Sequence, residues 1–124
     1  MGELAFEAAT GRANHTVVGF RAMRNATSGS ITTALGAEAA NGVTTGGHNA
    51  FLGHGTGGGV TTGSHNCYVG PHAGFGCGNT SYQTAVGREA GAHIDGSRNT
   101  MMGYQAMFGV SSGSSAANNV AVGY

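Results

Sequence analysis

The chain has 124 residues and a mass of 12.2 kDa, with no formal net charge, 25 glycines, one proline, no tryptophan and no lysine. Val, Leu, Ile and Phe together number 19, too few to fill the core of an ordinary globular domain of this length, so the composition argues against an independent enzyme. Nucleic acids and anionic membranes select basic proteins, and this chain has five arginines as its only cations. We therefore expect a non-enzymatic domain that uses no cofactor, binds no nucleic acid and does not insert into a membrane.

Residues 1–10 differ from the rest of the chain. Leu4 and Phe6 alternate with Glu3 and Glu7, and this period of two predicts a β-strand. Such a strand would cap the domain or attach it to a larger assembly, or would be an ordinary first strand. This segment has neither the basic region nor the apolar run of a signal peptide, so, if the chain is complete, we expect synthesis in a cytoplasm.

Residues 11–124 contain a repeat. An apolar residue followed by glycine recurs at successive spacings of 17, 17, 17, 17, 16 and 20 residues, a regularity that chance does not produce. Such a period indicates a stack of similar structural units. We call the repeated glycines the anchor glycines; they are Gly19, Gly36, Gly53, Gly70, Gly87, Gly103 and Gly123.

Other residue types recur at fixed offsets from the anchor glycines. Small residues recur three positions before and three positions after them, as in Ala50 and Thr56 around Gly53. Four positions before them asparagine recurs, as in Asn49 and Asn66, and we expect glycine and asparagine to supply the positive φ angles of a coil that reverses direction. The Thr-, Val- and Tyr-rich runs before each anchor glycine predict short strands.

The repeat predicts an all-β fold. Several glycines in every unit exclude helix, because each costs about 1 kcal/mol relative to alanine in a helix. We expect about seven rungs of 17 residues that form a β-roll, β-helix or β-prism rod. Leu52 and its equivalents would fill a narrow interior, leaving Phe51, Tyr68 and Met101 exposed on one chain. Packing these three side chains between chains would stabilise a homo-oligomer.

Candidate chemical motifs are few. Gly53–Gly58 fits a dinucleotide-loop spacing and Gly109–Gly113 fits a nucleophile elbow, but neither is followed by the helix that each function needs, and the repeat accounts for their glycines. His48 and His65 share one phase and are a candidate metal site, the alternative being two polar turns that face water. Cys67 and Cys77 occupy positions of small core residues, and we expect free thiols there.

The repeat resembles a known family. Asn118–Tyr124 is similar to the head repeat of trimeric autotransporter adhesins (YadA-like), and Gly63–Gly74, Thr80–Gly91 and Gly96–Ala106 are similar to longer variants in bacteriophage tail fibres and virion appendages. The resemblance covers almost the whole chain and implies a parallel β-roll or β-prism of three intertwined chains without catalysis. It departs from the adhesins in having a longer coil and no export signal, stalk or membrane barrel.

The resemblance implies a structural function. We expect a homotrimeric virion protein, assembled in the host cytoplasm as a capsid-decorating knob or spike or as a tail-fibre segment, with capsid or tail proteins as partners. Host attachment through surface glycans is a candidate role, with Phe20, Tyr104 and Tyr124 as ring platforms, although interchain packing is their competing use. The alternative is the head segment of a bacterial trimeric adhesin at the cell surface.

Overall fold

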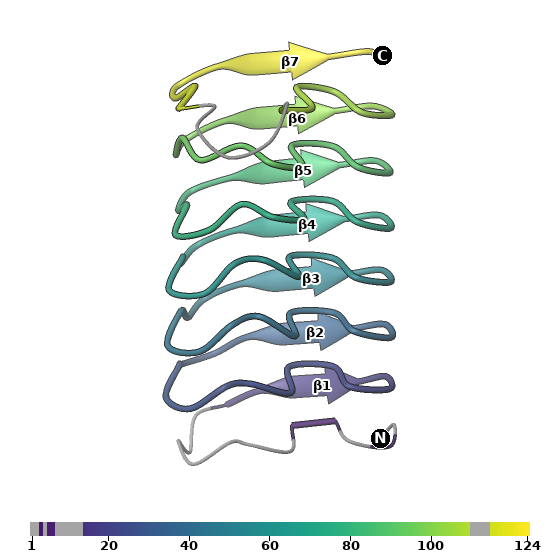
Figure 1. The fold of residues 1–124 in the computed structure, drawn as a ribbon, viewed down its shortest axis with the longest axis vertical. Helices are drawn as coiled ribbons and strands as arrows, with labels where there is room; N and C mark the ends of the chain where they lie inside the picture. Colours follow the sequence, from purple (N-terminus) through teal and green to yellow (C-terminus); the bar gives the residue numbers. More distant parts are fainter. Residues whose placement is uncertain (1–2, 4, 7–13, 110–114) are drawn as a thin grey trace.

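The computed structural model describes residues 3, 5–6, 14–109 and 115–124. Within them, seven three-residue strands form one parallel sheet in chain order, and the chain completes a coil between each strand and the next (Figure 1). The repeat therefore folds as a β-solenoid, which confirms the predicted all-β class. The strands are β1 (Thr16–Val18), β2 (Thr33–Leu35), β3 (Ala50–Leu52), β4 (Cys67–Val69), β5 (Thr84–Val86), β6 (Thr100–Met102) and β7 (Val120–Val122).

The pairing register follows the repeat. Residues in the same phase lie opposite one another, so that Ala50 pairs with Cys67 and Cys67 with Thr84. The 20-residue step is absorbed in the connection between β6 and β7, because Thr100 still pairs with Val120. The sheet thus keeps one register while the turns take up changes in length.

The anchor glycines have the backbone that the repeat predicts, with φ between 120° and 138°. At Gly70 an added Cβ would lie 2.7 Å from the carbonyl carbon and oxygen of Gly87 in the next coil, so both the φ angle and the close approach require glycine. Asn49, Asn66 and Asn99, however, are not left-handed; the preceding position is, as at His48, His65 and Arg98. The prediction that these asparagines supply positive φ is therefore wrong.

These asparagines instead form a buried amide ladder. The Asn49 Oδ1 accepts the backbone N–H of Asn66 at 2.9 Å, and the Asn66 Oδ1 accepts that of Gln83 at 3.0 Å. The Asn66 Nδ2 donates to the carbonyl oxygen of Thr80 at 2.9 Å. Each amide therefore joins two coils and satisfies backbone groups that water cannot reach, which explains why the sequence repeats asparagine at this phase.

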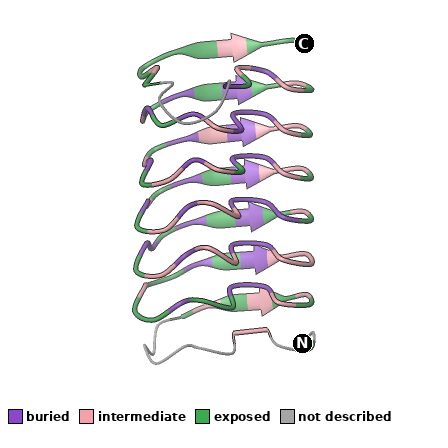
Figure 2. Ribbon diagram, viewed as in Figure 1, coloured by how far each residue is buried: buried purple, intermediate pink, exposed green. Residues whose placement is uncertain are grey.

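The interior is lined by the middle residue of each strand. Phe51, Tyr68 and Met101 are buried within a single chain, at 1%, 0% and 0% exposure, whereas Leu52 is 49% exposed (Figure 2). The predicted interior and exterior are thus reversed, and Phe51, Tyr68 and Met101 do not pack between chains. Alternate side chains of a strand point to opposite faces, so the residues on either side of an inward-facing Phe51 must point outward.

Glycine makes room for the large interior side chains. A Cβ on Gly57 would lie 2.7 Å from Cε1 of Phe51, and one on Gly74 would lie 2.2 Å from Cε2 of Tyr68. Where the middle strand residue is Ala34, the residue six positions later is Ala40 instead. In these three coils a large middle residue is therefore matched by glycine and a small one by alanine.

Three residues of the predicted N-terminal segment are described. Phe6 donates its backbone N–H to the carbonyl oxygen of Ala22 at 2.9 Å, and the Glu3 carbonyl oxygen accepts the N–H of Arg21 at 3.1 Å. Glu3 and Phe6 lie in turns, and Phe6 packs against the buried core. Leu4 and Glu7 lie outside the described residues, so the strand predicted for residues 1–10 stays a prediction.

Candidate functional site

Three surfaces run along the solenoid, and the first is the outward side of the sheet. We define the outer sheet face as the first and last residues of every strand. Its last-residue column includes Val18, Leu52 and Met102, at 50%, 49% and 51% exposure, and ends at Val122 with 74% exposure. Its first-residue column contains threonine, alanine, cysteine and valine, and neither column contains a charged residue. The outer sheet face is therefore a continuous, uncharged and largely apolar strip along the rod.

The second surface is a ladder of stacked rings beside the outer sheet face. The rings of His48 and His65 lie 5.0 Å apart and 5° from parallel, and those of His65 and Tyr82 lie 5.0 Å apart and 4° from parallel. Imidazole lone pairs lie in the plane of the ring, so stacked rings direct their nitrogens side by side rather than toward one ion. The described residues contain no group of three or more His, Cys, Asp or Glu side chains that could hold a metal, and a metal site at His48 and His65 stays a prediction.

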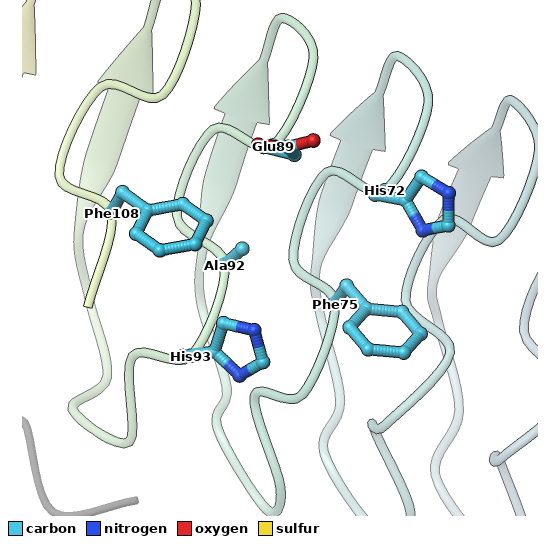
Figure 3. A pocket seen from close by; sticks show the side chains of 6 residues that line it. All are labelled: His72, Phe75, Glu89, Ala92, His93 and Phe108. Atoms are coloured by element: carbon cyan, nitrogen blue, oxygen red, sulfur yellow. The ribbon is translucent and has the colours of Figure 1, made fainter. Parts of the chain in front are cut away.

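The third surface is the turn edge, where the chain leaves each strand. A hollow of about 270 Å³ opens there, and its walls come from three consecutive coils (Figure 3). Two phenyl rings, two imidazoles and a carboxylate surround a small alanine, and we call this site the turn-edge hollow. Its residues are His72, Phe75, Glu89, Ala92, His93 and Phe108.

The carboxylate of the turn-edge hollow is fixed by its neighbours. Glu89 Oε2 accepts a hydrogen bond from Gln105 Nε2 at 2.6 Å, and Glu89 Oε1 accepts one from Arg88 Nε at 3.1 Å. The hydrogen bond from Gln105 and the positive charge of Arg88 hold the pKa of Glu89 below its usual value. Glu89 is therefore an anion whose charge is paired and whose orientation is set before any ligand arrives.

The aromatic residues predicted to contact glycans lie on the same edge. Phe20, Tyr104 and Tyr124 each follow an anchor glycine and are 42%, 40% and 94% exposed. The rings of Tyr104 and Tyr124 lie 5.4 Å apart, and the Arg88 guanidinium lies 5.8 Å from the Tyr104 ring centre. Tyr104 is thus linked through Arg88 to the turn-edge hollow, whereas Phe20 belongs to the first described coils at the other end of the rod.

The two cysteines are free thiols, as expected, but only one is in the core. Cys77 is buried, and its Sγ donates to the carbonyl oxygen of Gly91 at 2.8 Å. Burial raises the pKa of Cys77 to about 11. Cys67 is the first residue of β4 and lies exposed on the outer sheet face, so the prediction that it is a core residue is wrong.

Sequence reasoning missed the turn-edge hollow, although the repeat contains a signal for it. Phe75, Ala92 and Phe108 each stand five residues after an anchor glycine, and His72 and Glu89 each stand two after. Alignment of the units would have placed these side chains in adjacent columns. The sequence-based prediction used only aromatic residues within two positions of an anchor glycine, and so it left this cluster out.

No family model, curated protein or solved structure matches the chain. The part of the chain that the structure describes contains no helix with the length and hydropathy to cross a bilayer. The class that the coordinates define is a parallel β-solenoid with a 17-residue period.

Proposed function

We propose that the protein is a non-enzymatic structural element, a homotrimeric rod whose chains associate through the outer sheet face. The observation that supports this is the uncharged apolar strip along all seven strands, from Val18 to Val122. Each half-exposed Val, Leu or Met side chain covered by a neighbouring chain contributes roughly 1 kcal/mol. A sister chain has the same spacing between rungs, so that apolar residues of the two strips meet along the full length of the rod.

The match in period is the reason to propose a second copy of this chain as the partner that covers the outer sheet face. The outer sheet face has no charged residue, and so it selects no acidic or basic partner. A strip that presents two uncharged residues at every rung is complementary to another copy of itself, whereas an irregular globular partner would meet only a few rungs. The number three comes from the resemblance to trimeric adhesin heads and phage fibres.

The resemblance also supports the biological setting. A trimeric rod of this kind would form a decorating knob, a spike or a tail-fibre segment of a virion, with capsid or tail proteins as further partners. The head of a bacterial trimeric adhesin is the alternative, since it would use the same assembly. Immunogold electron microscopy of source cultures distinguishes the two, because antibodies to this chain would label particles in the first case and cell surfaces in the second.

Light scattering coupled to size-exclusion chromatography tests the assembly. We expect the wild-type chain to have the mass of three chains, and the double variant Leu52→Lys/Met102→Lys to be a monomer with an unchanged β-sheet circular dichroism spectrum. The control Ser28→Lys/Thr45→Lys adds the same charges at exposed turn residues and should stay trimeric. A monomeric wild type, or an outer-face variant that remains trimeric, would overturn the proposal.

A further inference from the structure

A shallow groove separates the ladder of stacked rings from the strands of the outer sheet face, and we call it the ring groove. It has a volume of about 490 Å³, and its walls come from three consecutive coils. The walls are formed by Ile31, His48 and His65 on one side and by Thr33, Ala50 and Cys67 on the other. All six of these residues are exposed, and the lining of the groove contains no Asp, Glu, Arg or Lys. The ring groove is therefore open and uncharged.

The floor of the ring groove does not need water to satisfy its polar groups. Asn49 and Asn66 line the groove between its two walls and are 3% and 2% exposed. Both belong to the buried amide ladder, and the Asn49 Nδ2 also donates to the carbonyl oxygen of Gly63 at 2.9 Å. The Oδ1 and Nδ2 atoms of both asparagines thus have hydrogen-bond partners within the chain. An apolar side chain can cover this floor without leaving a buried polar group unsatisfied.

An apolar ridge runs beside the ring groove along the rod. The ridge is the last-residue column of the outer sheet face, in which Val18, Leu52 and Met102 are half-exposed. Successive ridge residues are one rung apart, about 4.8 Å, and the ring centres of the ladder are 5.0 Å apart. The ridge of a second copy laid along the ring groove would therefore meet one ring edge at each rung. The ridge and the groove match in period and in their lack of charge.

We propose that the ring groove of each chain receives the apolar ridge of the neighbouring chain in the assembly. This inference rests on the proposed association through the outer sheet face and specifies which parts of that surface meet. Each chain presents one ridge and one groove, so ridge-to-groove contacts are heterologous in a trimer and close into a ring. Rotation about an axis along the rod keeps equivalent rungs at the same height. Val69, the ridge residue of β4, would then lie beside Cys67 of the neighbouring chain.

Disulfide cross-linking tests this contact, because Cys67 is a free and exposed thiol in the groove wall. We expect Val69→Cys, oxidised with diamide, to form a disulfide with Cys67 of the neighbouring chain. Within one chain the two side chains point the same way from positions about 6.6 Å apart, which is too far for the Cβ separation of an internal disulfide. A closed ring of three chains should therefore migrate as a covalent trimer on a non-reducing gel.

Two control variants show whether the disulfide reports the ridge in the groove. Val69→Cys/Cys67→Ser keeps the ridge cysteine and removes its partner, so it should stay uncross-linked. Cross-linking of this double variant would place ridge against ridge and would overturn the proposal. Met102→Cys lies on the same ridge but two rungs from Cys67, about 10 Å along the rod, and should form no disulfide with it. Circular dichroism on each variant verifies the β-sheet content.

A variant in the groove wall tests the same contact from the other side. Ala50→Lys should weaken association about tenfold in sedimentation equilibrium, because the ridge of the neighbouring chain would cover the added charge. Ser28→Lys adds the same charge at an exposed turn residue outside the groove and should have no effect. A wild-type trimer that tolerates Ala50→Lys and gives no disulfide with Val69→Cys would overturn the groove contact but not the trimer. A covalent dimer would support the groove contact and overturn the number three, and a monomeric wild type would overturn both.

Discussion

At the scale of single residues, the coil depends on glycines that permit contact between backbones. Gly53 and Gly70 combine a φ angle above 120° with a direct approach to the backbone of the next coil. Gly123 has a φ of 120° as well, but its added Cβ would meet no atom within 4 Å. The cost of the backbone conformation and the cost of steric crowding between adjacent coils can therefore be measured separately within one molecule.

Gly70→Ala should lower the free energy of unfolding by more than Gly123→Ala. Both variants force an L-residue into an unfavourable φ region, at about 1–3 kcal/mol, and only the Gly70 variant also pushes a methyl group into the Gly87 carbonyl. Urea unfolding followed by circular dichroism measures the difference. Equal losses at the two positions would contradict the importance of the close approach.

At the scale of the repeated element, three of the coils match the size of the middle strand residue to that of the residue six positions later. Phe51 is matched by Gly57, and Tyr68 by Gly74, whereas Ala34 is matched by Ala40. The sequence spacing alone does not explain why position 57 is glycine. The ring of Phe51, which occupies the space that a Cβ would need, does explain it.

A double-mutant cycle at Phe51 and Gly57 tests this sharing of volume. Phe51→Ala should destabilise by about 3–5 kcal/mol because it leaves a cavity, and Gly57→Ala should destabilise by about 1–3 kcal/mol through overpacking. The double variant reproduces the natural Ala34 and Ala40 combination, so its loss should be smaller than the sum of the single losses. Thermal or urea unfolding gives the coupling energy, and strict additivity would refute the pairing.

At the scale of the whole molecule, the solenoid buries its large middle strand residues within one chain and leaves an uncharged strip outside. The interior therefore does not require other chains to cover Phe51 or Tyr68, contrary to the reasoning from composition. The outer sheet face, in contrast, exposes Val18, Leu52 and Met102 to water. Assembly would thus stabilise a coil that already has its own core.

The proposed trimer should be insensitive to screening of charges. Its contact surface has no charged residue, so raising the salt concentration from about 0.05 M to about 1 M removes no ion pair and should not dissociate it. Light scattering or sedimentation across this range provides the measurement. Dissociation at high salt would place the interface on a charged surface instead, such as the edge that carries Arg88 and Glu89.

The repeat by itself predicted the period, the short strands before each anchor glycine and the all-β coil, because these depend on local conformation and on equivalent residues lying opposite one another. It did not determine which side of the strands faces inward. Phe51 and Leu52 are both apolar and adjacent, so a hydrophobic interior could be formed with either of the two side chains facing inward.

Only the tertiary structure decided that Phe51 and not Leu52 lies inside, because closure of the coil leaves room for one large side chain per strand. It likewise decided the turn-edge hollow, since Phe75, Ala92 and Phe108 come from three different coils and become neighbours only through stacking. The buried amide ladder of Asn49 and Asn66 is explained in the same way, by backbone groups of adjacent coils that must be hydrogen-bonded away from water.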